Sequence, residues 1–162
     1  MALSRWQRFG YAWVNFGPRI SMHEYCHKAD IDLSRMARDD RFSEIEKLAD
    51  RLMTDIEKIV PVLPISLVAA VIKEYGSRGL SAFDVENRVN RLIAQIEANG
   101  APVYVTTRGR VETILNALEM LRIRRLVVES EGVYRAAPGE DDILTYYANS
   151  IAHWLSSTQV RR

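Results

Sequence analysis

Three side chains that commonly bind metal ions lie close together near the N-terminus, namely His23, Cys26 and His27. Imidazole and thiolate groups are typical zinc ligands, but a structural zinc site takes four ligands, and no fourth one lies beside these three. The surrounding residues are charged, as on an ordinary surface helix. We therefore interpret the group as a chance cluster and predict no metal site.

Sequence motifs of a self-contained active site are missing as well. The chain has no Gly-x-Ser-x-Gly nucleophile motif, no Walker-type phosphate loop and no dinucleotide-binding fingerprint. The sequence therefore predicts no catalytic residue and no cofactor.

The segment from Tyr146 to Trp154 combines aromatic side chains, an amide and a histidine in one amphipathic stretch. On a helix, an apolar stripe predicted to pack in the core comprises Ile143, Tyr147, Ile151 and Trp154 or Leu155. A neighbouring polar and aromatic stripe comprises Tyr146, Asn149 and His153. Two roles stay open for this second stripe: it satisfies backbone groups of the loops that it covers, or it faces another domain.

This tail resembles the C-terminal signature of the glycerol-3-phosphate acyltransferase family. A second segment, from Tyr11 to Ser21, contains Phe16, Gly17 and Pro18 and is similar to the strand and turn that follow the catalytic motifs of that family. The two segments lie in the family's order along the chain. The resemblance implies that the chain corresponds to the C-terminal region of such an enzyme, downstream of its active site.

The function that the resemblance implies is that of a complete enzyme. Such an enzyme would transfer a fatty acyl group from a thioester carrier to the 1-hydroxyl of glycerol 3-phosphate, in phospholipid biosynthesis. None of the family's catalytic or substrate-binding residues has a counterpart here, so the chain alone is expected to be inactive. Its expected partner is an acyltransferase catalytic domain, on a longer polypeptide or on a separate chain. The residues expected to dock on that domain or to support the docking are Phe16, Gly17, Pro18, Tyr146, Tyr147, Asn149 and His153.

The family's active site uses a His-x4-Asp pair, in which the histidine is the general base and the aspartate orients it. His27 and Asp32 have this spacing. They follow the Phe16-Gly17-Pro18 turn, however, whereas the family places its pair upstream of the turn. The glycine- and arginine-rich segment that follows the family's pair also has no counterpart, so we interpret this match as accidental.

Net charge, cysteine content and the lengths of the apolar stretches indicate where the protein is expected to be located. The formal net charge of the 162 residues is +1, which provides no overall field to attract nucleic acid or anionic lipid. The single cysteine, Cys26, fits a reducing compartment. The N-terminus lacks the apolar core of a signal peptide, and the longest apolar stretch, Ile59 to Ile72, is too short to span a membrane. We expect a cytoplasmic protein whose contact with the inner face of a membrane is at most peripheral.

Residues 1–60 are predicted to form the C-terminal edge of an acyltransferase domain. Residues 11–16 have the pattern of a strand that ends at a Gly-Pro turn. Because no partner strand lies nearby, this strand is expected to pack on the following helix or to join copies of the chain through residues 1–20. That helix is predicted over 43–60 with Ser43 as its N-cap. Its apolar face comprises Ile45, Leu48, Leu52, Ile56 and Ile59.

Residues 64–157 are predicted to form a second, helical module. Three helices are expected over 65–75, 81–99 and 110–121, with Ser81 capping the second and Asn99-Gly100 ending it. A β-hairpin over 126–135 and a last helix over 141–156 follow. This is the order of a winged helix-turn-helix module, and we predict an α+β chain, mainly α, in which that module follows a strand-and-helix appendage.

The winged-helix order raises an alternative function, a stand-alone interaction module or a nucleic-acid-binding module. Arginines cluster around the third helix of the module, at Arg108, Arg110, Arg122, Arg124 and Arg125. The same helix also exposes Glu112 and Glu119, and the hairpin tip, residues 129–132, is acidic where a wing that enters a groove should be basic. Nucleic acid is therefore an unfavoured partner.

Overall fold

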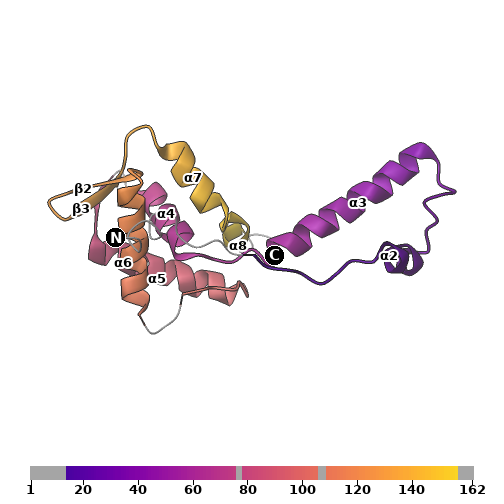
Figure 1. Ribbon diagram of the computed structural model, residues 1–162, viewed down its shortest axis with the longest axis horizontal. Helices are drawn as coiled ribbons and strands as arrows, with labels where there is room; N and C mark the ends of the chain where they lie inside the picture. The colour runs from indigo at the N-terminus through magenta and orange to yellow at the C-terminus, as the bar shows by residue number, and fades with distance from the viewer. Residues whose placement is uncertain (1–13, 76–77, 106–108, 157–162) are drawn as a thin grey trace, which may run out of the picture. The chain divides into compact units, whose positions relative to one another are not determined.

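The computed structural model describes residues 14–75, 78–105 and 109–156. The chain divides into two compact units with a boundary in the sequence between Ile59 and Val60, and each unit is described by itself. Both are built from helices, and the second also contains one small antiparallel sheet (Figure 1). This composition confirms the predicted α+β class, mainly α.

The first unit, Val14–Ile59, contains α2 (Met22–Ala29) and α3 (Arg38–Glu57). The hydroxyl of Ser21 caps α2 by accepting a hydrogen bond from the Glu24 backbone N–H. The start predicted for the helix over 43–60 is wrong, because α3 begins at Arg38 and Ser43 lies inside it. Asp39 and Asp40 occupy its first turn, where negative charge suits the helix dipole and favours the earlier start.

The strand expected over residues 11–16 cannot be followed along its whole length. Residues 11–13 lie outside the described ranges, and residues 14–16 have no regular secondary structure. The side-chain amide of Asn15 instead donates a hydrogen bond of 2.7 Å to the backbone carbonyl of Ile59.

The described part of the second unit contains helices and short strands. Its elements are α4 (Pro64–Tyr75), β1 (Leu80–Ser81), α5 (Ala82–Ala98), α6 (Arg110–Ile123), β2 (Val127–Ser130), β3 (Val133–Ala136), α7 (Asp141–Asn149) and α8 (Ala152–Ser156). The three strands form an antiparallel sheet in the order β1-β3-β2. The single helix predicted over 141–156 is divided, because the chain turns between α7 and α8.

Local signals in the sequence account for two boundaries of this unit. Ser81 and Asp84 form a capping box at the start of α5, in which each side chain bonds the backbone N–H of the other residue. The β2–β3 hairpin turns through Glu131 and Gly132, which both have positive φ, as in a two-residue turn of type I′. The predicted cap and hairpin are therefore confirmed.

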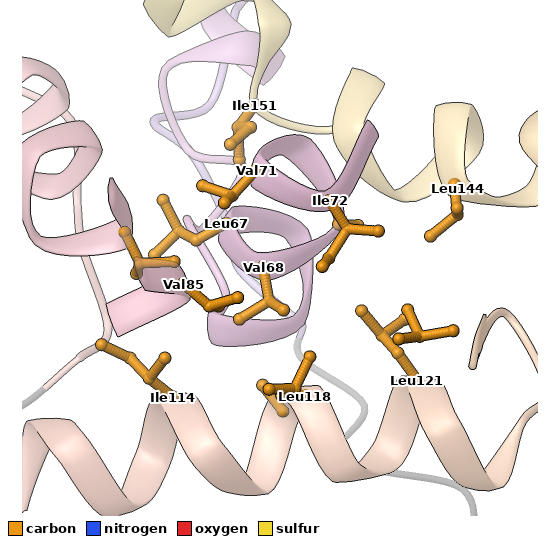
Figure 2. Close-up of a cluster of buried hydrophobic side chains, with 14 of the residues drawn as sticks. Leu67, Val68, Val71, Ile72, Val85, Ile114, Leu118, Leu121, Leu144 and Ile151 are labelled. Carbon is orange, nitrogen blue, oxygen red and sulfur yellow. The ribbon is translucent and has the colours of Figure 1, made fainter. Parts of the chain in front are cut away.

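The core of the second unit is organised around α4, which contacts α5, α6 and α7. Figure 2 shows Val68 and Ile72 of α4 on the side that faces Leu118 and Leu121 of α6, with Leu144 and Ile151 on other sides of α4. The fully buried set includes Leu67, Ile72, Ile93, Ile114, Leu118, Leu121, Leu144 and Ile151. No helix in the described ranges is long and apolar enough to cross a membrane.

Candidate functional site: exposed docking surfaces

An exposed apolar stripe runs along α3. Its members recur at helical spacing, yet each exposes a large share of its surface: Phe42 58%, Ile45 45%, Leu52 40%, Met53 57% and Ile56 48%. We call these five residues the α3 stripe. Leu48, on the same side of the helix, is the only buried residue of α3, at 9% exposure. A helix with this pattern normally buries its apolar side against another surface.

The opposite side of α3 carries charges that pair with one another. Lys47 bonds the carboxylate of Glu44 at 2.5 Å, and Lys58 bonds that of Asp55 at 2.7 Å. These pairs raise the pKa of Lys47 and lower that of Asp55, because each charge is stabilised by hydrogen bonding to its partner. The polar side of α3 is therefore suited to solvent, whereas the α3 stripe is its exposed apolar side.

The Phe16-Gly17-Pro18 turn belongs to the same unit. The Phe16 side chain is 92% exposed. A side chain added at Gly17 would approach the Ile59 side chain to 3.4 Å, so the turn lies against the residues that follow α3. Phe16 thus adds an exposed aromatic group to the apolar surface of this unit.

The predicted polar and aromatic stripe of the tail is only partly exposed. Tyr146 is 76% exposed, and Asn149 on the next turn of α7 is also exposed. His153, on α8, is half-buried, and its ring centroid lies 5.1 Å from that of Trp154. The structure therefore separates the three residues: Tyr146 and Asn149 face solvent, and His153 contributes to packing.

Tyr147 has a structural role instead of an exposed one. Its hydroxyl accepts a hydrogen bond from a guanidinium N–H of Arg124, whose Cζ lies 5.7 Å from the centre of the Tyr147 ring. The bond ties α7 to the end of α6. Tyr147 therefore has a structural role within the second unit.

Two further hydrogen bonds anchor the tail, and sequence reasoning missed both. Ser150 donates to the Ser66 hydroxyl of α4 at 2.8 Å, and the Asn99 side chain donates to the Trp154 carbonyl at 2.8 Å. Their partners are separated by 84 and 55 residues. No local spacing pattern connects residues so far apart in the chain.

The predicted apolar stripe of the tail needs one correction. Ile143 is 46% exposed, and its neighbour Leu144 is fully buried in its place. Leu144, Tyr147 and Ile151 follow one another at steps of three and four, so this set faces α4 without Ile143. Ile143 instead adds an apolar side chain to the exposed side of α7 near Tyr146.

His27 and Asp32 serve separate local structures. His27 lies in the last turn of α2, where its ring centroid is 6.4 Å from that of His23. Asp32 accepts hydrogen bonds from the Ser34 hydroxyl and backbone N–H, which lower the Asp32 pKa, and it pairs with Arg35 at 3.2 Å. Asp32 thus stabilises a turn, and no hydrogen bond within the described residues joins it to His27. Nor does any group of three His, Cys, Asp or Glu side chains in those residues have the geometry of a metal site.

The arginines around α6 are largely engaged by neighbours. Arg122 forms two hydrogen bonds of 2.6 Å with the Glu119 carboxylate, which lower the pKa of Glu119. Arg110 lies 3.9 Å from the carboxylate of Glu97, and Arg124 bonds Tyr147. Arg125 is exposed, and Arg108 lies outside the described residues. Most of the cluster is thus committed within the unit, which weakens its fit to a phosphate backbone.

Comparison with known proteins decides the family. A model of the glycerol-3-phosphate acyltransferase C-terminal region matches residues 2–158. The chain belongs to this family. The match confirms the resemblance seen in the two end segments and extends across the helices between them. No solved structure matches the chain.

Proposed function

We propose that this chain is the non-catalytic C-terminal part of a glycerol-3-phosphate acyltransferase-like protein and that it docks on the catalytic region through the α3 stripe. The observation that carries the proposal is the exposure of that stripe on a helix of 20 residues. From Ile45 to Ile56 the stripe extends about 16 Å at the rise of an α-helix. Packing of an apolar face supplies most of the stability of such a helix, so a partner surface is needed.

The catalytic region is the partner that the family favours. The matched region is by its description the C-terminal one, so a preceding region belongs to the same kind of protein. The exposed apolar groups of the first unit include two aromatic side chains, Phe16 and Phe42, and aromatic residues are enriched in interface cores. Acyl transfer to glycerol 3-phosphate is then an activity of the assembled protein, in the cytoplasm or at the inner face of a membrane.

For the second unit we propose a winged-helix arrangement that serves protein contact. Helix, short strand, two helices and a hairpin in the sheet order β1-β3-β2 support this assignment. The pairing of Arg122 with Glu119 and the acidic hairpin tip, Glu129 to Gly132, favour a protein partner over nucleic acid. Tyr146 and Asn149 of α7 are the residues that this unit offers to the assembly.

The test is binding between the chain and a separately produced catalytic region of a glycerol-3-phosphate acyltransferase from the same organism, measured by isothermal titration calorimetry. Leu52→Asp places a charge in the middle of the α3 stripe and should weaken binding about 100-fold, because a buried unpaired charge is costly. Thr54→Asp is the matched control. It adds the same charge to the exposed opposite side of the same helix and should leave the affinity unchanged.

An activity measurement completes the test. The purified chain should transfer no acyl group from a thioester donor to glycerol 3-phosphate, whereas the complex should. Equal affinities of the Leu52→Asp and Thr54→Asp variants would refute docking through α3. Turnover by the chain alone that disappears in His27→Ala would refute the non-catalytic role.

A further inference from the structure

A shallow depression of about 200 Å³ lies between the end of α4 and the middle of α5. Val71 and Leu92 contribute its apolar floor. Its polar lining comprises Glu74, Tyr75, Arg88, Arg91 and Gln95. The depression belongs to the second unit and has no part in the docking proposed through α3.

Two guanidinium groups dominate the lining. Arg88 and Arg91 are three residues apart on α5, so both project from one side of the helix, and Gln95 follows one turn later. The Cζ of Arg88 lies 3.8 Å from the centre of the Tyr75 ring, which holds this guanidinium against the wall by a cation–π contact. Arg91 is exposed. Neither guanidinium lies within ion-pair distance of a carboxylate among the described residues.

The acidic groups nearby have hydrogen-bond partners of their own. Glu74 accepts a hydrogen bond from the Tyr75 hydroxyl, which raises the Tyr75 pKa. Asp84, one turn before Arg88, accepts a hydrogen bond of 2.6 Å from the Ser81 hydroxyl in the capping box; the bonds from Ser81 lower the Asp84 pKa more than the nearby Arg88 charge does. With Glu74 counted, the lining still has two positive groups against one negative group. The N–H groups of Arg91 and the amide of Gln95, which both line the depression, are thus open to a ligand.

We propose that this depression binds the phosphate group of a phosphomonoester, with Arg91 and Arg88 as its charged donors and Gln95 as a neutral donor. A guanidinium presents parallel N–H groups that match two oxygens of a phosphate. The depression is smaller than the 300 Å³ or more of pockets that enclose a drug-sized molecule, so it takes one headgroup and leaves the remainder of the ligand in solvent. A soluble metabolite and a lipid headgroup both present this chemistry.

The test is a titration of the full chain with methyl phosphate at constant ionic strength, followed by the amide and arginine Nε–H resonances in ¹⁵N NMR spectra. Shifts should concentrate at Glu74, Tyr75 and residues 88–95. Arg91→Gln should weaken binding about tenfold, since a charge-assisted hydrogen bond is lost. Glu74→Gln should tighten it about threefold, because one repulsive charge disappears.

Arg125→Gln is the control, because Arg125 is an exposed arginine of the same unit outside the depression. Its affinity should equal that of the unmodified chain. If it weakens binding as much as Arg91→Gln does, or if Glu74→Gln has no effect, only non-specific surface charge is acting and the proposal fails. Circular dichroism of each variant confirms that the fold is intact.

The source of the phosphate is distinguished in a second arm. The chain is sedimented with phosphatidylcholine vesicles that contain or lack phosphatidic acid. If the chain binds the vesicles that contain phosphatidic acid, and the Arg91→Gln variant binds them more weakly, the ligand of the site is a lipid headgroup. Binding of methyl phosphate without vesicle binding assigns it to a soluble phosphomonoester, and absence of both overturns the proposal.

Discussion

Gly79 is the position at which the three-stranded sheet depends most directly on one small residue. It immediately precedes β1 and has a φ of +77°, in the left-handed region that L-residues with side chains disfavour. A Cβ atom added there would lie 2.5 Å from Cγ1 of Val133 and 3.0 Å from Cζ of Arg135. Both residues belong to β3, which pairs with β1 through Ser81 and Val133. Gly79→Ala should therefore destabilise the pairing of β1 with β3.

The magnitude follows from two contributions. The left-handed conformation costs about 1 to 2 kcal/mol for alanine. The contact with the branched Val133 side chain adds about 1 to 3 kcal/mol, the range for overpacking, because Val133 cannot retreat without disturbing β3. Gly100→Ala isolates the first contribution, since Gly100 has a φ of +82° and no atom within 4 Å of the added Cβ. The two variants should differ by about 1 to 3 kcal/mol.

The assay is urea unfolding of the full chain followed by circular dichroism, with the free energy of unfolding extrapolated at a common slope. Gly79→Ala should have the lower midpoint of the two variants. Equal midpoints for Gly79→Ala and Gly100→Ala would show that β3 does not press on Gly79, and the close approach of β1 to β3 would then be refuted.

Three further changes test the second unit by the same unfolding assay. Leu118→Ala should cost about 2 to 5 kcal/mol, because it opens a cavity against α4, and a loss below 1 kcal/mol would contradict full burial. Tyr147→Phe removes the acceptor of the Arg124 hydrogen bond and should cost about 1 kcal/mol, whereas an unchanged midpoint would show that the bond contributes nothing. Hydrogen bonds from Ser81 lower the pKa of Asp84 below its ordinary value of 3.8. The stability that Asp84 contributes is therefore fully present above pH 3.8 and is lost as the pH falls through the pKa of the folded state. Asp84→Asn should therefore reduce the loss of stability on acidification, and an identical pH profile would contradict this role.

Much of the secondary structure was predictable because its signals are local. The start of α5 at Ser81 and its end at Asn99-Gly100 depend on residues within one turn of each boundary. The apolar spacing along α3 and α6 is likewise a property of neighbouring residues. At the start of α3 two local signals competed, and the acidic first turn at Asp39 and Asp40 outweighed the capping-box spacing at Ser43.

The family, too, was accessible from the sequence, because the two end segments contain recognisable residue patterns in a fixed order. The roles of individual tail residues were not. A helical stripe cannot distinguish Ile143 from Leu144 as the core residue until the angle at which α7 meets α4 is known. Nor could the stripe show that Tyr146 is exposed to solvent while its neighbour Tyr147 bonds Arg124.

Local residue patterns were sufficient to locate most of the helices and the hairpin and to indicate the family, although they misplaced the start of α3 and joined α7 to α8. The tertiary structure was needed to show which side chains far apart in the chain meet, as Ser66 and Ser150 do across 84 residues. It also decided which apolar faces are covered: α4 is enclosed by three helices, whereas the α3 stripe stays exposed. The physical reason is that helical periodicity is set by adjacent residues, while burial depends on every element that packs against a face.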